Sequence, residues 1–206
     1  MGIAVRDGVV APSAATHQVG IDFLYLDLET CTRCRGTDAN LEAALAQVGH
    51  VLNAAGAVVA VRKTLVASAE QAQAIGFISS PTIRVNGQDI ALELRESRCA
   101  ECGEACACDG TIDCRVWVWQ GQEHTEAPTA MIIDAILRAV YGGGERASAP
   151  ASVGAVPENL ARFFAGKERL AASVTCCPTA RSTRPARPAE KASCCGDRNS
   201  ASCGCQ

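Results

Sequence analysis

Two thiols stand three positions apart in the motif Cys31-Thr32-Arg33-Cys34. An apolar run over residues 21–28 precedes the motif and a helical pattern follows it, so the thiols are expected at a strand-to-helix turn. A helix N-terminus and nearby guanidinium groups both favour thiolate over thiol. The pattern therefore predicts Cys31 as the nucleophile of a redox dithiol and Cys34 as its resolving partner. Zinc knuckles and soft-metal carriers use the same C-x-x-C spacing, so the motif alone leaves metal binding open.

A second group of thiols occupies residues 95–115, which form a cysteine-rich insert. Its five cysteines are Cys99, Cys102, Cys106, Cys108 and Cys114. A C-x-x-C pair followed by further cysteines is a spacing that can wrap a tetrahedral zinc ion. The predicted structural zinc ligands are Cys99, Cys102, Cys106 and Cys114. The alternatives are two disulfides among these four residues, with undecided connectivity, or catalytic and ion-transfer thiols.

Six more cysteines lie in three close pairs near the C-terminal end. They are Cys176 and Cys177, Cys194 and Cys195, and Cys203 and Cys205. Vicinal and C-x-C thiols chelate soft ions, so the pairs are predicted to bind As(III) or another soft ion. Arg, Pro and Ser separate them, and such a composition predicts a disordered tail over residues 173–206. The competing interpretation is an oxidation-prone appendage with no selected ligand.

Composition limits the classes of function. The chain has 206 residues, of which 48% are apolar, enough for one packed core. Aromatic residues make up only 4%, which argues against a base-stacking surface and so against nucleic-acid binding. Residues 1–144 carry ten Lys/Arg against seventeen Asp/Glu, whereas residues 145–206 carry nine against five. The body is therefore acidic and the C-terminal part basic.

The sequence predicts a cytoplasmic protein. Its start lacks a basic segment followed by an apolar stretch and a cleavage site, and no apolar run reaches the ~18 residues of a membrane span. We therefore expect neither secretion nor membrane insertion. In a reducing compartment, clustered cysteines are more often metal ligands or redox catalysts than structural bridges.

Hydrophobic patterns predict alternating strands and helices. Residues 21–28 suit a buried strand, and apolar residues at helical spacing from Leu41 to Leu52 end at Gly56. A β-branched run over residues 57–61 suits a second strand, followed by a helix from the N-cap Ser68 to Gly76. Strand-helix-strand-helix predicts a parallel strand pair with a right-handed crossover.

A hairpin and a last helix are predicted after this unit. Asn86-Gly87 is a two-residue hairpin signal with arms at residues 82–85 and 88–94. Pro81 stands at the entrance of the first arm, where proline is tolerated. Residues 116–119 alternate like a strand, and a helix is expected over residues 128–141.

This order of elements resembles the thioredoxin fold over residues 20–143. The resemblance implies an α/β fold with a mixed sheet flanked by helices, and a cis Pro81 lying against the C-x-x-C motif as part of a catalytic site. Thr30 stands where thioredoxins have tryptophan, and Thr32-Arg33 replaces their Gly-Pro. These departures weigh against general disulfide reductase activity.

The chain also resembles a small bacterial thioredoxin-like family of unknown function that is associated with arsenic- and metal-resistance genes. The shared marks are Ser80-Pro81-Thr82-Ile83, the Cys99/Cys102 pair, Asp113-Cys114-Arg115-Val116-Trp117 and Glu126-Ala127-Pro128. This resemblance implies a fold and a genetic neighbourhood, and no particular activity.

The remaining segments flank this domain. Residues 1–19 are predicted to be a frayed arm or a weak extra strand. Residues 144–172 read as a linker followed by a short amphipathic helix that starts near Pro157. The apolar stripe of that helix consists of Leu160, Phe163, Phe164 and Leu170. A helix docked on the parent domain is favoured over a partner-binding helix.

Three functional hypotheses follow. The first is a thiol-based protein of metalloid or heavy-metal resistance that binds, reduces or transfers a soft ion. The second is a general thiol-disulfide oxidoreductase that acts on a partner protein. The third is a non-catalytic binding module stabilised by zinc, in which the C-x-x-C motif is structural.

Overall fold

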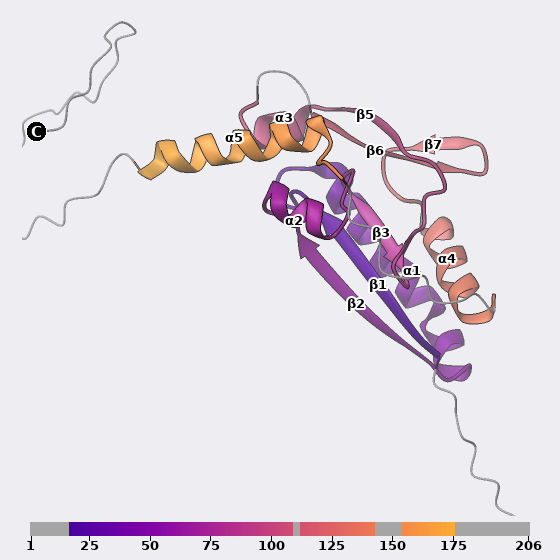
Figure 1. The fold of residues 1–206 in the computed structure, drawn as a ribbon. Helices are drawn as coiled ribbons and strands as arrows, with labels where there is room; N and C mark the ends of the chain where they lie inside the picture. Colours follow the sequence, from indigo (N-terminus) through magenta and orange to yellow (C-terminus); the bar gives the residue numbers. More distant parts are fainter. Residues whose placement is uncertain (1–16, 109–111, 143–153, 176–206) are drawn as a thin grey trace, which may run out of the picture.

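A computed structural model describes residues 17–108, 112–142 and 154–175 (Figure 1). Its strands are β1 (His17–Tyr25), β2 (Ala57–Leu65), β3 (Thr82–Val85), β4 (Gln88–Asp89), β5 (Arg95–Cys99), β6 (Ile112–Trp119) and β7 (Gln122–His124). Its helices are α1 (Thr32–Ala54), α2 (Ala69–Ala74), α3 (Ala100–Ala105), α4 (Thr129–Tyr141) and α5 (Glu158–Thr175).

The main sheet has four strands in the order β2-β1-β3-β4. β1 runs parallel to β2 and antiparallel to β3, and β3 is antiparallel to β4. β1 begins at His17, earlier than the predicted strand over residues 21–28, and Ile21 lies opposite Val61, so β-branched residues of the two strands pair directly. The predicted α/β fold with a mixed sheet is confirmed, and the predicted parallel pairing of the first two strands is present.

Two helices cover one face of this sheet. Figure 1 shows α1 and α4 on the same side of β1 and β3. The core between them and the sheet is formed by Val19, Ile21, Phe23, Leu41, Ala44, Val48, Leu52, Ile83, Met131, Ile132, Ile136 and Val140. Each large apolar side chain buried here contributes about 1.5–3 kcal/mol, so this packing anchors β1 and α1, the elements that flank the C-x-x-C motif.

The cysteine-rich insert contains regular secondary structure. β5, β6 and β7 form a second antiparallel sheet, and α3 connects β5 towards β6. β6 begins at Ile112, earlier than the strand predicted from residue 116, and therefore includes Cys114. Trp117 of β6 is fully buried in the core of the main sheet, which ties the two sheets together.

The predicted second hairpin arm over residues 88–94 is wrong beyond Asp89. The Asp89 carboxylate accepts the backbone N–H of Ala91 at 3.0 Å and pairs with Arg115 at 2.8 Å, which turns the chain away from β3. Leu92 then projects into solvent with 95% of its surface exposed. The next strand, β5, pairs with β6 instead of β3.

The docked helix predicted near residue 157 is confirmed as α5. Leu160, Phe163 and Phe164 are buried against the cysteine-bearing elements, whereas Leu170 is partly exposed. Lys167 also binds Asp27 at 3.3 Å, at the end of β1. α5 runs to Thr175, so residues 173–175 are helical and the predicted disordered tail cannot begin at residue 173. The six predicted tail cysteines, and residues 1–16 of the predicted N-terminal arm, lie outside the described residues.

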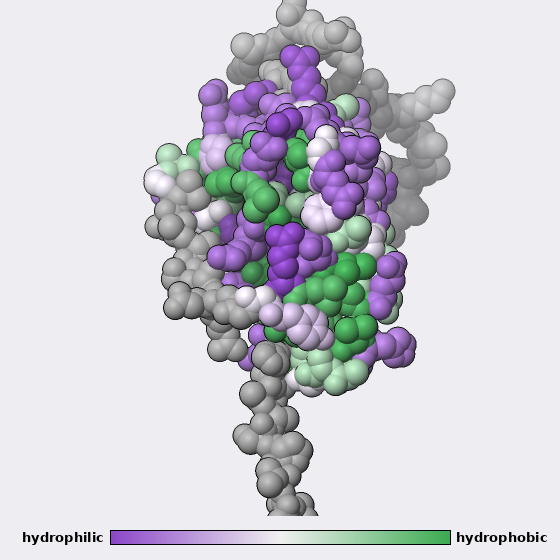
Figure 2. Space-filling view, turned by 90° about the vertical axis from the view of Figure 1, so that its right-hand side faces the viewer, coloured by the Kyte–Doolittle hydropathy of each residue, from purple (hydrophilic) through white to green (hydrophobic). Residues whose placement is uncertain are grey.

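Figure 2 shows a mostly hydrophilic surface on the side that carries α4 and β7, with apolar side chains in patches. A groove of about 390 Å³ beside α4 is lined partly by Ile90, Leu92, Trp119 and Met131, and no cysteine lines it. Among the described residues, no helix is long and apolar enough to cross a membrane.

Candidate metal centre

The C-x-x-C motif opens α1 directly after the turn that follows β1. Cys31 is the N-cap residue with an extended backbone, and its carbonyl accepts the N–H of Arg35 at 3.2 Å. Cys34 follows one turn later on the same helix, and both side chains are fully buried. The predicted strand-to-helix turn is therefore present, but neither thiol is exposed to solvent.

The loop that contains Pro81 lies beside the second thiol. The Ser80–Pro81 peptide bond is cis, as the resemblance to thioredoxins implies, and Pro81 is buried. The Ser80 hydroxyl accepts the N–H of Leu26 at 3.2 Å and lies 3.4 Å from Cys34 Sγ. Ser80 thus links the end of β1 to the second thiol.

Three cysteines of the insert face the same point. Cys99 ends β5, Cys102 lies in α3, and Cys114 lies in β6 opposite Ser97 of β5. All three side chains are buried. The hairpin pairing of β5 with β6 and the short α3 between them therefore present three sulfurs from one compact unit.

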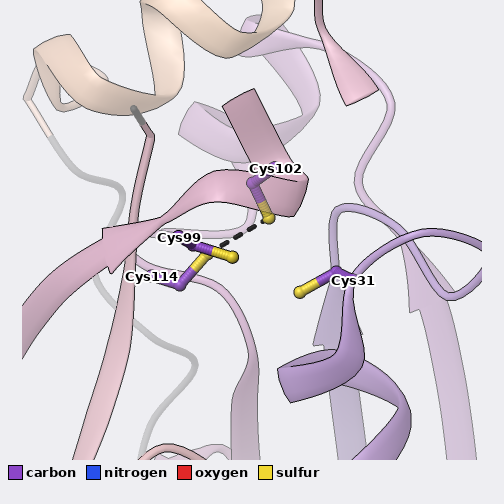
Figure 3. Close-up of side chains that lie close together, drawn as sticks. All are labelled: Cys31, Cys99, Cys102 and Cys114. Carbon is purple, nitrogen blue, oxygen red and sulfur yellow. Dashed lines mark hydrogen bonds between the residues drawn. The ribbon is translucent and has the colours of Figure 1, made fainter. Parts of the chain in front are cut away.

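Cys31, Cys99, Cys102 and Cys114 form what we call the cysteine cluster (Figure 3). Their four sulfurs all lie within 4.8 Å of one another. Cys114 Sγ donates a hydrogen bond to Cys102 Sγ at 3.2 Å. Figure 3 shows Cys31 approaching from α1 while the other three approach from the insert.

This arrangement fits a tetrahedral thiophilic ion. Four sulfurs that each lie about 2.3 Å from a tetrahedral zinc ion are about 3.8 Å from one another. In the cluster one sulfur–sulfur distance is 3.2 Å and none exceeds 4.8 Å, so the spacing is compatible with such an ion. Four cysteines with no histidine or carboxylate in the set are donors that favour zinc and softer ions over magnesium or calcium. The cluster has the composition and burial of a closed metal site.

Comparison with known proteins places the chain in a family. Residues 19–136 match the family described as "Domain of unknown function (DUF2703)", which covers more than half of the chain. The chain belongs to this family. No curated protein and no solved structure matches it. All four residues of the cysteine cluster lie within the DUF2703 domain, whereas α5 lies beyond the matched residues.

The DUF2703 domain brings together three of the four predicted zinc ligands. Cys99, Cys102 and Cys114 lie in the cluster, but Cys106 does not: it forms a disulfide with Cys108 on the turn after α3. The fourth sulfur belongs to Cys31, which the sequence pattern assigned to catalysis. Spacing within the insert could not predict that Cys31 replaces Cys106, because Cys31 reaches the cluster only where the start of α1 contacts β5 and β6 through Arg33.

The thiols of the DUF2703 domain shift one another's pKa values. Hydrogen bonds from Cys102, Cys114, Cys34 and Cys99 lower the pKa of Cys31. The hydrogen bond with Cys31 and burial raise the pKa of Cys34, and contacts with Cys102, Cys31 and Cys99 raise that of Cys114. The lowered pKa of Cys31 agrees with the sequence prediction, but neighbouring thiols cause it rather than arginine. Since ion binding must displace the remaining protons, acid should weaken it.

The two residues inside the C-x-x-C motif, Thr32 and Arg33, bind the cysteine-rich insert of the DUF2703 domain. Arg33 Nη2 donates to the carbonyl of Arg98 at 2.7 Å, and Arg33 Nη1 reaches the hydroxyl of Ser97 at 2.9 Å and the carbonyl of Cys114 at 3.4 Å. Thr32 Oγ1 donates to Glu101 at 2.8 Å. Arg33 thus clamps α1 to both strands that carry cluster cysteines, a role that sequence reasoning missed.

A second arginine of the DUF2703 domain ties the insert to the Pro81 loop. The buried Arg115 donates its backbone N–H to the carbonyl of Ser80 at 2.7 Å and its guanidinium to Thr82 Oγ1 at 3.0 Å. The same guanidinium lies 5.2 Å from the ring centre of Trp117. Arg115 follows Cys114 directly, so these contacts also fix the position of a cluster sulfur.

Proposed function

We propose that this DUF2703 protein is a thioredoxin-like, thiol-based protein that binds one thiophilic ion in its cysteine cluster and serves in metalloid or heavy-metal resistance. The carrying observation is the meeting of four buried sulfurs from α1, β5, α3 and β6 within 4.8 Å of one another. Zinc and As(III) are the two ions to test first. Zinc uses all four thiolates, while As(III) needs three.

The burial of Cys31 favours ion binding over disulfide exchange with a partner protein. A thiolate that attacks a protein disulfide must approach it in line, so it must be accessible. The side chain of Cys31 is fully buried beneath the insert, and Arg33 and Thr32 hold the insert closed over it. The alternative of a thiol-disulfide oxidoreductase rests on the C-x-x-C motif beside the cis Pro81, and it requires the insert to open.

The arrangement also favours a functional centre over an incidental cluster. Cys31, Cys34, Cys99, Cys102 and Cys114 are all buried together although they come from four different elements, α1, β5, α3 and β6. Two arginines and a threonine–glutamate pair are arranged around these thiols, which is the support expected for metal ligands.

Metal analysis of the full-length chain tests the proposal. The protein is purified anaerobically with a reductant, and its zinc content and its As(III) uptake are measured alongside those of Cys114→Ser and Cys108→Ser. Cys114 lies in the cluster, whereas Cys108 lies outside it. We expect Cys114→Ser to lose about one zinc per chain and Cys108→Ser to keep it, with X-ray absorption showing sulfur at about 2.3 Å from zinc.

The control separates the cluster from the other thiols of the chain. Both variants remove one cysteine and keep the C-terminal pairs, so a difference between them reports on the cluster alone. Equal zinc content in the two variants, or a wild-type protein that takes up neither ion, would refute the proposal.

A further inference from the structure

Only one thiol of the C-x-x-C motif belongs to the cysteine cluster. Cys31 is a member, and Cys34 is not, although it is fully buried next to it. Cys34 follows Cys31 by three residues at the start of α1, and its sulfur lies 3.4 Å from the Ser80 hydroxyl. A metal ligand therefore has a spare thiol as its direct neighbour.

The local geometry allows these two sulfurs to join. Cys31 caps α1 and Cys34 lies in its first turn, the position from which C-x-x-C cysteines interconvert between dithiol and disulfide. Residues three apart in the first turn of a helix lie on the same face, so a disulfide between these two needs little movement of the backbone. The residues between them, Thr32 and Arg33, are fixed by the insert, so the turn is held in a single conformation.

We propose that Cys34 makes the ion site redox-gated: a Cys31–Cys34 disulfide withdraws one of the four ligands and releases the ion. This inference rests on the proposed function, since it needs an ion in the cluster. It assigns Cys34 a role in regulating the site without making it a ligand.

Hydrogen peroxide is the oxidant class that fits a buried site, because it is small. The Cys31 sulfur attacks one peroxide oxygen, the O–O bond breaks, and hydroxide leaves, so Cys31 becomes a sulfenic acid. The Cys34 thiol then attacks that sulfur, the S–O bond breaks, and the oxygen leaves as water with the thiol proton. The two thiols lose two electrons and peroxide gains them. The three remaining cluster cysteines no longer complete a tetrahedral zinc site.

The test compares zinc release from full-length wild type and Cys34→Ser. Both proteins are loaded with zinc, their zinc content is measured, and peroxide is added while a chromogenic chelator follows free zinc. Wild type should release its cluster zinc about tenfold faster than Cys34→Ser, and peptide mass spectrometry should find a Cys31–Cys34 disulfide. A thiol reductant should restore binding in wild type.

The possible results distinguish the proposed redox gate from the proposed ion binding. Equal zinc loading followed by equal release rates, or a disulfide that joins Cys31 to another cysteine, overturns the gate and leaves ion binding standing. Absence of cluster zinc from both proteins before oxidation overturns both proposals. If Cys34→Ser does not fold, Cys34→Ala serves as the variant, because a small apolar residue suits this buried position.

Discussion

Arg33 spans three parts of the molecule with one side chain. Its planar guanidinium donates to β5 at Ser97 and Arg98 and to β6 at Cys114, while its backbone belongs to α1. A lysine at this position has a single ammonium group and does not reproduce a fork that reaches two strands. The side chain thus sets how closely the sulfur of Cys31 approaches those of the insert.

Arg33→Lys should therefore weaken zinc binding by about tenfold, the lower end of the effect expected when support for metal ligands is lost. Lysine and arginine have similar helix propensities, so α1 itself should be unaffected. The matched control is Arg35→Lys, since Arg35 is exposed and its side chain donates to the carbonyl of Glu29, away from the insert. Competition with a zinc chelator measures both affinities, and equal values for the two variants would contradict the clamp.

Residue types and spacing predicted most of the cluster and missed its fourth member. Cys99, Cys102 and Cys114 stand close together in sequence, so local spacing was enough to select them. Cys106 satisfied the same spacing, and only the turn after α3, which pairs it with Cys108, excludes it. Which cysteines join the cluster depends on packing between segments distant in sequence. The spacing of a C-x-x-C motif is the same whether its thiols catalyse redox chemistry or bind a metal ion.

Two helical glycines differ in what surrounds them. At Gly49 in α1, an added Cβ meets no atom within 4 Å. At Gly166 in α5, an added Cβ would lie 2.5 Å from the carbonyl oxygen of Cys106 and 2.6 Å from Cys108 Sγ. Gly166 is thus the point at which α5 packs closely on the disulfide turn.

The same substitution should have opposite effects at these positions. Gly49→Ala should raise the free energy of unfolding by about 0.5–1 kcal/mol, because alanine restricts the unfolded chain and favours helix. Gly166→Ala should lower it by about 1–3 kcal/mol through overpacking. Urea unfolding followed by circular dichroism measures both. A stabilising Gly166→Ala would mean that α5 does not pack on this turn.

Hydrophobic patterns predicted the main-sheet elements, which are local features, and were less successful in the insert. Buried runs and helical spacing identified β1, α1, β2, α2, β3 and α4. β5 escaped prediction because its sequence, Arg95-Glu-Ser-Arg-Cys99, has no strand-like alternation of apolar residues. Its strand character comes from pairing with β6, which sequence periodicity does not report.

The charge and cysteine distribution of the whole chain separates two parts. The acidic body holds the cysteine cluster, and the basic C-terminal part holds six cysteines in three pairs. A tether raises the effective concentration of a tail-bound ion at the body to about the millimolar range for a short flexible linker. We therefore propose that the tail pairs collect a soft ion and deliver it to the cluster.

Removing residues 176–206 tests this delivery. The truncated protein should bind less As(III) per chain, retain the one ion held by the cluster, and load that ion more slowly at low As(III) concentration, because the tethered supply is lost. Isothermal titration gives the stoichiometry and stopped-flow measurement of thiol absorbance gives the loading rate. Identical stoichiometry and rate in the two proteins would show that the tail plays no part.

The four cysteines of the cluster are synthesised in two stages. Cys31 and Cys34 emerge with the start of α1, whereas the other three cysteines follow only after β2, α2, β3 and β4 have been made. At about 5–20 residues per second, synthesis from residue 34 to residue 99 takes roughly 3–13 s. During that interval the nascent chain carries an isolated dithiol with no insert to cover it. Newly made chains are therefore the population in which an oxidant or a soft ion meets Cys31 and Cys34 before the other three thiols can compete.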